Sequence, residues 1–156
     1  MAQQVWFLRH GEAEPHDARP DEQRRLTERG EAQSRAAGRA LQRMGIPIHL
    51  VFSSPKVRAW DTARLACEAL GVEPIEHRAL GDGFTREDAL ELAAADPDNR
   101  ILVVGHNPTF EQVVYDLTGA RIDLRKGAVA GVRLRGGQGE LISLLQPREL
   151  ELLAGG

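Results

Sequence analysis

Apolar residues along this chain occur in short runs that alternate with longer segments of helical periodicity. The runs at residues 5–8, 48–52 and 101–104 are rich in β-branched or aromatic residues, which favours buried strands. The run at 101–104, Ile-Leu-Val-Val, is apolar without alternation and therefore predicts a strand buried on both faces. Such burial is typical of a parallel sheet that is covered by helices.

Helices are predicted between these strands, where apolar residues recur three and four positions apart. One helix covers about residues 28–44, with Thr27 as its N-cap and Gly45 at its end. A second covers residues 57–70 and ends at Gly71, in the position favoured for a C-cap. Three shorter helices are predicted at residues 85–95, 109–117 and 148–153. We expect the first to stop at Asp96-Pro97 and the second to be capped by Asn107 or Thr109.

The rest of the chain predicts a polar loop and peripheral strands. Residues 15–25 carry two prolines and many charged side chains, so we expect an exposed loop, the one place where a flap could sit. Residues 74–78 predict a short strand, and 129–134 with 140–146 a hairpin or two edge strands. This order predicts a single α/β domain over residues 1–156, a three-layer α/β/α sandwich with a mostly parallel central sheet.

The composition is that of an ordinary globular domain. With 156 residues, 42% of them hydrophobic and 28% charged, the chain is suited to one folded domain. A net charge of −3 gives no general attraction to nucleic acid or anionic membranes, so any phosphate must be bound by a local positive site. Cys67 is the single cysteine, residues 1–4 show no signal-peptide pattern, and no apolar run could span a membrane. We therefore expect a cytoplasmic protein.

Arg9 and His10 stand directly after the first predicted strand. Open α/β sheets bind ligands beyond the carboxyl ends of their strands, so this pair is well placed for binding. The Arg9 guanidinium offers a planar fork of donors to an oxyanion, and a neutral His10 imidazole is a usable nucleophile. Gly11 would let the backbone turn or approach a ligand closely. Taken alone, however, the Arg-His-Gly tripeptide is better explained as part of a surface loop.

Two further strand-to-helix junctions carry groups of the same kind. Residues 53–63, Ser-Ser-Pro-Lys-Val-Arg-Ala-Trp-Asp-Thr-Ala, place Arg58 in the first turn of a helix, which the helix dipole disfavours unless an anion binds there. His106 follows the most apolar strand, in the run Gly-His-Asn-Pro. Recurrence at three equivalent junctions predicts one pocket for a phosphoryl group, with His106 held on a rigid element.

With these three motifs the chain resembles the histidine phosphatase superfamily, the phosphoglycerate mutase-like enzymes. The motifs match that family in order and setting, and the resemblance spans most of the chain. In its short length and in the residues at 8–13 and 53–63, the chain most resembles the SixA-type phosphohistidine phosphatases. The resemblance implies that His10 is the phosphorylated nucleophile and that Arg9, Arg58 and His106 bind the phosphoryl oxygens.

Elementary chemistry supports the same roles. Phosphoryl transfer spreads negative charge over the equatorial oxygens, so we expect Arg9, Arg58 and a protonated His106 to stabilise the transition state. Nucleophilic attack by His10 divides hydrolysis into transfer to imidazole and attack of water on the phosphoenzyme, which requires no metal and no cofactor. A main-chain carbonyl or another group near Gly11 is expected to fix the tautomer of His10.

The proton donor is open at this stage. Asp82 lies in the region where larger members of the family carry a catalytic Glu, and Glu12 is the other candidate. An alkyl phosphate needs a proton donor, whereas phosphohistidine leaves as imidazole, so a weak acid favours phosphohistidine as the substrate. The short chain also favours an open site that admits a histidine on another protein. The alternatives are a small-molecule phosphomonoesterase or mutase and a phosphate-binding module without turnover.

Other polar residues are expected outside the site. The remaining histidines have no metal-ligand spacing and are expected at the surface or in structural roles, namely His16, His49 and His77. Cys67 is expected in the core. Arg24 and Arg25 are expected in a solvated loop, with a docking patch for an acidic partner as the less favoured reading. No metal, nucleic-acid or membrane partner is predicted, and the oligomeric state is not determined.

Overall fold

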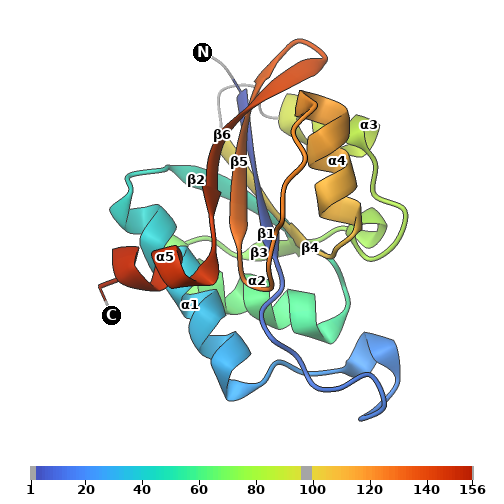
Figure 1. Ribbon diagram of the computed structural model, residues 1–156, viewed down its shortest axis with the longest axis vertical. Coiled ribbons are helices and arrows are strands. Elements are labelled where there is room, and N and C mark those ends of the chain that lie inside the picture. The colour runs from blue at the N-terminus through green and yellow to red at the C-terminus, as the bar shows by residue number, and fades with distance from the viewer. Residues whose placement is uncertain (1–2, 96–99, 156) are drawn as a thin grey trace.

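The computed structural model describes residues 3–95 and 100–155, and within them six strands form one sheet in the order β3-β2-β4-β1-β5-β6 (Figure 1). Four neighbouring strands are parallel: β3 (Pro74–Glu76), β2 (Ile48–Ser53), β4 (Arg100–Gly105) and β1 (Gln3–Arg9). The hairpin of β5 (Val129–Arg135) and β6 (Gln138–Leu145) adds two antiparallel strands beside β1. The mostly parallel sheet and the hairpin predicted from the sequence are confirmed.

Helices cover both faces of this sheet (Figure 1). On one face lie α1 (Glu28–Arg43), α2 (Val57–Leu70) and α5 (Pro147–Leu153). On the other lie α3 (Arg86–Ala94) and α4 (Thr109–Thr118). Two 3-10 turns, η1 (Asp21–Gln23) and η2 (Arg78–Leu80), lie in the connections. The fold is therefore the three-layer α/β/α sandwich that the sequence predicts.

Alternate residues of the central strands enter the two halves of the core. In β1, Val5 and Phe7 pack with α3 and α4, whereas Trp6 and Leu8 pack with α1, α2 and α5. All four are buried, and burying each large apolar side chain stabilises the fold by roughly 1.5 to 3 kcal/mol. A strand with helices on both faces needs apolar residues at every position, which explains the unbroken apolar runs.

The ends of most helices follow the sequence signals. Thr27 caps α1 by accepting a hydrogen bond from the Gly30 N–H at 3.1 Å, and Thr85 forms a capping box with Asp88 at the start of α3. Gly71 ends α2 with a left-handed φ of 73°, which glycine adopts without strain. The predicted stop at Asp96-Pro97 lies outside the described residues.

The predicted cap of α4 is wrong. Pro108 is the N-cap residue, and no side chain makes a capping hydrogen bond there. Asn107 instead donates from Nδ2 to the Leu124 carbonyl at 2.8 Å, which ties this loop to the segment before β5. In residues 3–95 and 100–155, no helix has the length and apolar character needed to cross a membrane.

Candidate active site

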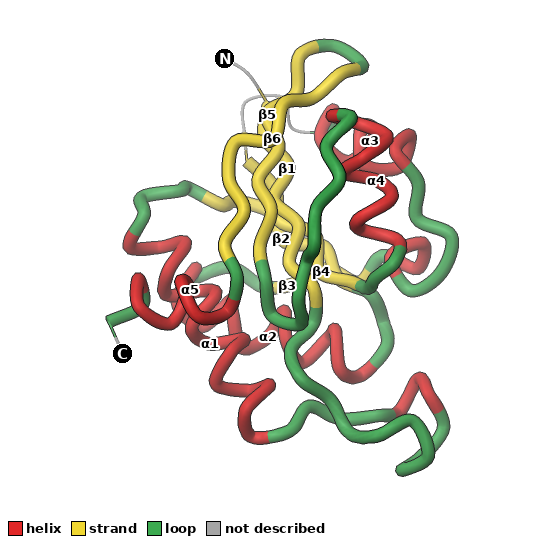
Figure 2. The backbone as a smooth tube through the Cα atoms, viewed as in Figure 1, coloured by secondary structure: helices red, strands yellow, loops and turns green. Residues whose placement is uncertain are grey.

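The three predicted junctions meet at one end of the sheet, because β2, β4 and β1 are adjacent and parallel (Figure 2). Main-chain hydrogen bonds join them: the His10 N–H donates to the Gly105 carbonyl, and the Ser54 N–H to the Val104 carbonyl, each at 3.0 Å. A cavity of about 270 Å³ lies at this end, and Arg9, His10, Arg58 and His106 all line it. We call it the phosphate pocket.

His10 is held as a neutral imidazole with a defined tautomer. Its Nδ1 lies 2.7 Å from the Gly11 carbonyl oxygen, so Nδ1 carries the proton and donates it there. Nε2 therefore keeps its lone pair, as a nucleophile requires. The side chain is only 6% exposed, and this burial lowers the pKa of His10 to about 3. The expected carbonyl partner near Gly11 is thus the Gly11 carbonyl itself.

His106 faces His10 across the pocket, with ring centroids 5.3 Å apart. Its Nε2 lies 2.8 Å from the hydroxyl oxygen of Ser54, which also accepts a hydrogen bond from the Lys56 N–H at 3.2 Å. The Ser54 hydroxyl can donate to Nε2 while it accepts from the Lys56 N–H, and in that arrangement the proton of His106 lies on Nδ1. Nδ1 is buried and has no partner among the described residues.

Without a bound phosphoryl group, the pocket disfavours the protonated form of His106. Burial, together with the positive charges of Arg58 and Lys56, lowers the pKa of His106 to about 3. The imidazole is therefore neutral at pH 7 and serves the pocket as an N–H donor rather than as a third cation.

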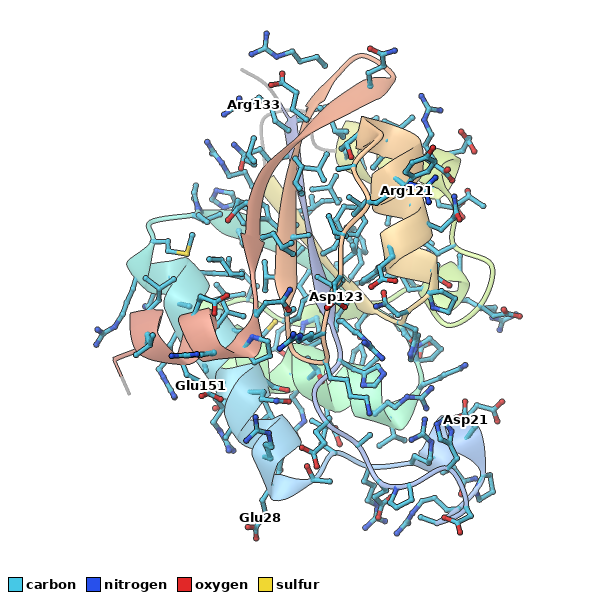
Figure 3. All side chains as sticks on the ribbon, viewed as in Figure 1. Asp21, Glu28, Arg121, Asp123, Arg133 and Glu151 are labelled. Carbon is cyan, nitrogen blue, oxygen red and sulfur yellow. The ribbon has the colours of Figure 1, made fainter. Side chains whose placement is uncertain are left out.

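Arg58 is held by the loop that follows β1. Its side chain is 7% exposed, and its Nη1 donates to the Asp21 carbonyl at 2.7 Å. Its Nη2 lies 3.3 Å from the Asp21 carboxylate, which also pairs with Arg24 and Lys56. Although its partial burial acts in the opposite direction, these cations lower the pKa of Asp21 to about 2. Figure 3 labels Asp21 on this loop, beyond the end of the sheet.

Arg24 corrects the expectation of a wholly solvated loop. Its side chain is 8% exposed, and it lines the phosphate pocket. Nη1 donates to the Glu14 carbonyl at 2.6 Å, and Nε donates to the Asp21 carboxylate at 3.1 Å. The polar composition of residues 15–25 contained no signal for this burial, which depends on how the loop folds over the strand ends.

The pocket is suited to an anion. Arg9 donates from Nη1 to the Leu124 carbonyl at 3.0 Å, which orients its guanidinium. In the described part of the chain, Nε of Arg9, Nε of Arg58 and Nδ1 of His106 are buried donors without partners. Arg9 and Arg58 both line the pocket, and guanidinium groups are well suited to pair with the oxygens of a phosphoryl group. Within residues 3–95 and 100–155 no cluster of three or more His, Cys, Asp or Glu side chains could hold a metal ion.

The structure separates the two candidate proton donors. Asp82 is exposed and lines the phosphate pocket. Glu12 does not line it; its carboxylate lies 3.4 Å from Nε of Arg29 in a neighbouring groove.

His16, expected at the surface, is indeed exposed but borders the pocket, which no sequence pattern indicated. Cys67 is buried as expected, and its burial raises the pKa of the thiol to about 12.

Behind the pocket, Thr62 holds the segment that carries His10. Its hydroxyl oxygen accepts a hydrogen bond from the Gly11 N–H at 3.1 Å, and its O–H donates to the Arg58 carbonyl at 2.8 Å. Gly11 does not have a positive φ. The absence of a side chain at Gly11 lets the backbone of α1, rather than a ligand, come close to it. A Cβ at Gly11 would lie 2.5 Å from the Gly30 carbonyl oxygen. No sequence pattern singled out Gly30.

Comparisons with known proteins agree with this geometry. The histidine phosphatase superfamily (branch 1) matches residues 5–83, a segment that includes Arg9, His10 and Arg58. An uncharacterized protein of Picosynechococcus sp. is 32% identical over 139 residues, which cover 83% of this chain and 84% of that protein. A 2,3-bisphosphoglycerate-dependent phosphoglycerate mutase of Methylobacterium radiotolerans is 43% identical over 60 residues, only 36% of this chain and 28% of the mutase.

A solved structure of the protein histidine phosphatase SixA, complexed with tungstate, superposes on this fold with a TM-score of 0.85. The two chains are 26% identical, and the match covers 94% of this chain and 99% of that one. One conclusion follows from the extent of the family match, from the relative that spans most of the chain and from the shared fold. This chain belongs to the histidine phosphatase superfamily.

Proposed function

We propose that this protein is a phosphatase that removes the phosphoryl group from phosphohistidine on another protein, with a phosphohistidine intermediate on His10. The observation that supports it most directly is the phosphate pocket, where a neutral imidazole with a free Nε2 stands among buried guanidinium groups. The similarity to SixA over 94% of the chain supports the same choice of substrate.

The first step transfers the phosphoryl group to His10. Nε2 attacks phosphorus while the P–N bond to the substrate imidazole breaks, and the leaving imidazole takes up one proton. Negative charge on the equatorial oxygens is stabilised by Arg9 and Arg58 and by the N–H of His106. In the second step water attacks the phosphorus on His10, which releases inorganic phosphate and restores the neutral imidazole.

Asp82 is the proton donor that this proposal favours, because it borders the phosphate pocket and Glu12 does not. The same placement supports the second candidate function, hydrolysis or transfer of a phosphomonoester of a small molecule. A monoester depends on protonation of its alkoxide leaving group far more than a phosphoramidate does. Replacing Asp82 therefore distinguishes the two substrate classes.

The test compares three substrates: a phosphohistidine-bearing protein, p-nitrophenyl phosphate and 3-phosphoglycerate. We expect phosphate release to be fastest from the phosphohistidine protein and an acid-labile phosphoenzyme to form during turnover. His10→Ala should abolish both, whereas His49→Ala, an exposed histidine on β2, should leave both unchanged. Asp82→Asn should slow release from 3-phosphoglycerate, whose leaving group is an alkoxide, but change release from phosphohistidine little.

Each other outcome has a definite meaning. Turnover that is unchanged in His10→Ala would show that the nucleophile assignment is wrong. Faster release from 3-phosphoglycerate than from phosphohistidine would establish the small-molecule alternative instead. Phosphate binding without release from any substrate would identify a binding module without turnover.

A further inference from the structure

A second and larger cavity, of about 920 Å³, adjoins the phosphate pocket. Arg9, Ala13 and Lys126 line both cavities, so the two lie side by side at this point. The larger one runs between the segment before β5 and the start of α5, and we call it the Arg148 groove. A side chain that enters the phosphate pocket from this direction would leave its neighbouring residues in the groove.

The groove has a fixed wall. Gln146, just before α5, donates from Nε2 to the Asp123 carbonyl at 2.6 Å and accepts at Oε1 from the Arg125 N–H at 3.2 Å. The Gly127 N–H lies 2.9 Å from the His10 carbonyl and donates to it. The wall is therefore attached both to α5 and to the segment that carries His10. Figure 3 labels Asp123 at the end of the sheet where these segments meet.

Cations outnumber acids on this groove. Five cations line it, Arg9, Arg29, Arg125, Lys126 and Arg148, against three acids, Glu12, Asp123 and Glu149. Each acid already has a partner within the groove wall: Glu12 pairs with Arg29 at 3.4 Å, Asp123 with Arg125 at 3.6 Å, and Glu149 accepts from the Gln146 N–H at 2.9 Å.

Two of the cations remain available to a partner. Lys126 and Arg148 are exposed, and neither forms an ion pair within residues 3–95 and 100–155. Lys126 stands where the groove meets the phosphate pocket, and Arg148 stands on the part of the groove outside that pocket. A chain with a net charge of −3 thus presents a local positive surface next to its catalytic pocket.

We propose that the Arg148 groove binds an acidic segment that flanks the phosphohistidine of the substrate protein. This inference rests on the proposed function, which supplies phosphohistidine as the substrate. It adds the surface of this protein that selects the substrate protein. Carboxylates of the segment pair with Lys126 and Arg148 while the phosphorylated imidazole occupies the phosphate pocket. Exposed pairs of this kind act on association and on selectivity between partners more than on the chemical step.

The experiment uses two phosphohistidine peptides of equal length, one flanked by Glu residues and the other by Gln at the same positions. We expect the wild-type protein to hydrolyse the Glu peptide with a higher kcat/KM by roughly fivefold or more, which corresponds to about 1 kcal/mol. Arg148→Glu should remove this preference, and its kcat/KM for free phosphohistidine should stay unchanged. Added salt should weaken the preference in the wild-type protein.

The matched control is Arg39→Glu, which makes the same charge change at an exposed position of α1 outside both cavities. It should keep the preference for the Glu peptide. Equal kcat/KM for the two peptides in the wild-type protein, or a preference that survives in Arg148→Glu, would overturn the inference. So would an equal loss of activity toward free phosphohistidine in Arg148→Glu, because the residue would then belong to the catalytic machinery.

Binding distinguishes a failure of this inference from a failure of the proposed function. The two peptides are also prepared with a non-hydrolysable phosphohistidine analogue, and their dissociation constants are measured by calorimetry. If no phosphohistidine substrate is hydrolysed but the Glu peptide binds more tightly through Arg148, the proposed function fails and the groove assignment stands. Equal affinity of both peptides overturns the groove assignment whatever the turnover.

Discussion

The chemistry of the site depends on proton positions on two imidazoles. His10 donates its proton to the Gly11 carbonyl and keeps Nε2 free, whereas His106 has its Nε2 against Ser54 and its Nδ1 without a partner in the described part of the chain. The first arrangement suits a nucleophile and the second an N–H donor to a phosphoryl oxygen. Neighbouring oxygens therefore give two chemically identical side chains opposite roles.

Ser54 is expected to act as a positioning residue for His106. Ser54→Ala should lower kcat by roughly tenfold, the cost of about 1 to 1.5 kcal/mol for a lost hydrogen bond. The specific readout is the nitrogen chemical shifts of His106, which should show a mixture of tautomers in Ser54→Ala and one tautomer in the wild-type protein. Ser54→Thr, which keeps the hydroxyl, should restore both.

A control for this variant is Ser143→Ala, which removes a hydroxyl from β6. It should leave the kcat and the His106 shifts unchanged. If Ser54→Ala kept a single His106 tautomer and the wild-type kcat, Ser54 would have no positioning role.

Close contact with α1 and α2 sets the position of the segment that carries His10. The backbone at Gly11 and Glu12 lies directly against Gly30 in the first turns of α1, and Thr62 of α2 holds the Gly11 N–H. Two helices thus fix the carbonyl that orients His10. Gly11 and Thr62, which lie in the runs that also contain His10 and Arg58, both take part in this contact.

Gly30→Ala provides a test of this contact. Alanine in place of glycine inside a helix normally stabilises it by about 0.5 to 1 kcal/mol. Here a Cβ would overlap the Glu12 carbonyl, so we expect the free energy of unfolding to fall by roughly 1 to 3 kcal/mol instead. We also expect kcat to fall, because the displaced Glu12 adjoins the Gly11 carbonyl that holds His10.

The matched control is Ala32→Gly, at an exposed position of the same helix. It should cost about 1 kcal/mol through helix propensity alone and leave kcat unchanged. Chemical denaturation and steady-state kinetics measure both quantities. A Gly30→Ala protein as stable and as active as the wild type would contradict the proposed importance of this contact.

At the scale of the whole molecule, the assembled layers bury two histidines that lie far apart in the sequence. His10 is 6% exposed and His106 is 9% exposed, and burial lowers the pKa of each to about 3. In the unfolded chain each would titrate near 6.5. The unfolded state therefore binds more protons than the folded state between about pH 6.5 and pH 3, so acid favours unfolding.

This linkage predicts a loss of stability on acidification. Between pH 7 and pH 5 the free energy of unfolding should fall by roughly 1 to 2 kcal/mol for each of the two histidines. The double variant His10→Asn with His106→Asn should lose correspondingly less over the same interval, whatever its stability at pH 7. Urea denaturation at the two pH values measures the difference. An equal loss in both proteins would show that these histidines are not the source.

The amino-acid sequence by itself determined the fold and the four residues that meet in the phosphate pocket. Unbroken apolar runs predicted strands covered on both faces, because such strands have no solvated side. Arg9, Arg58 and His106 could be assigned to one pocket with His10, since adjacent parallel strands bring their carboxyl ends to one edge. Periodicity and strand order are properties of the chain itself, and they suffice for this much.

The tertiary structure alone decided the lowered pKa of His106, the burial of Arg24, the contact of Gly11 with Gly30 and which of Asp82 and Glu12 borders the phosphate pocket. Each of these depends on atoms from segments that are distant in the sequence. Desolvation, close backbone approach and the shape of a cavity arise only when those segments pack together. For the same reason the Arg148 groove, built from the end of β1, the start of α1, the segment before β5 and the start of α5, had no signature in the sequence.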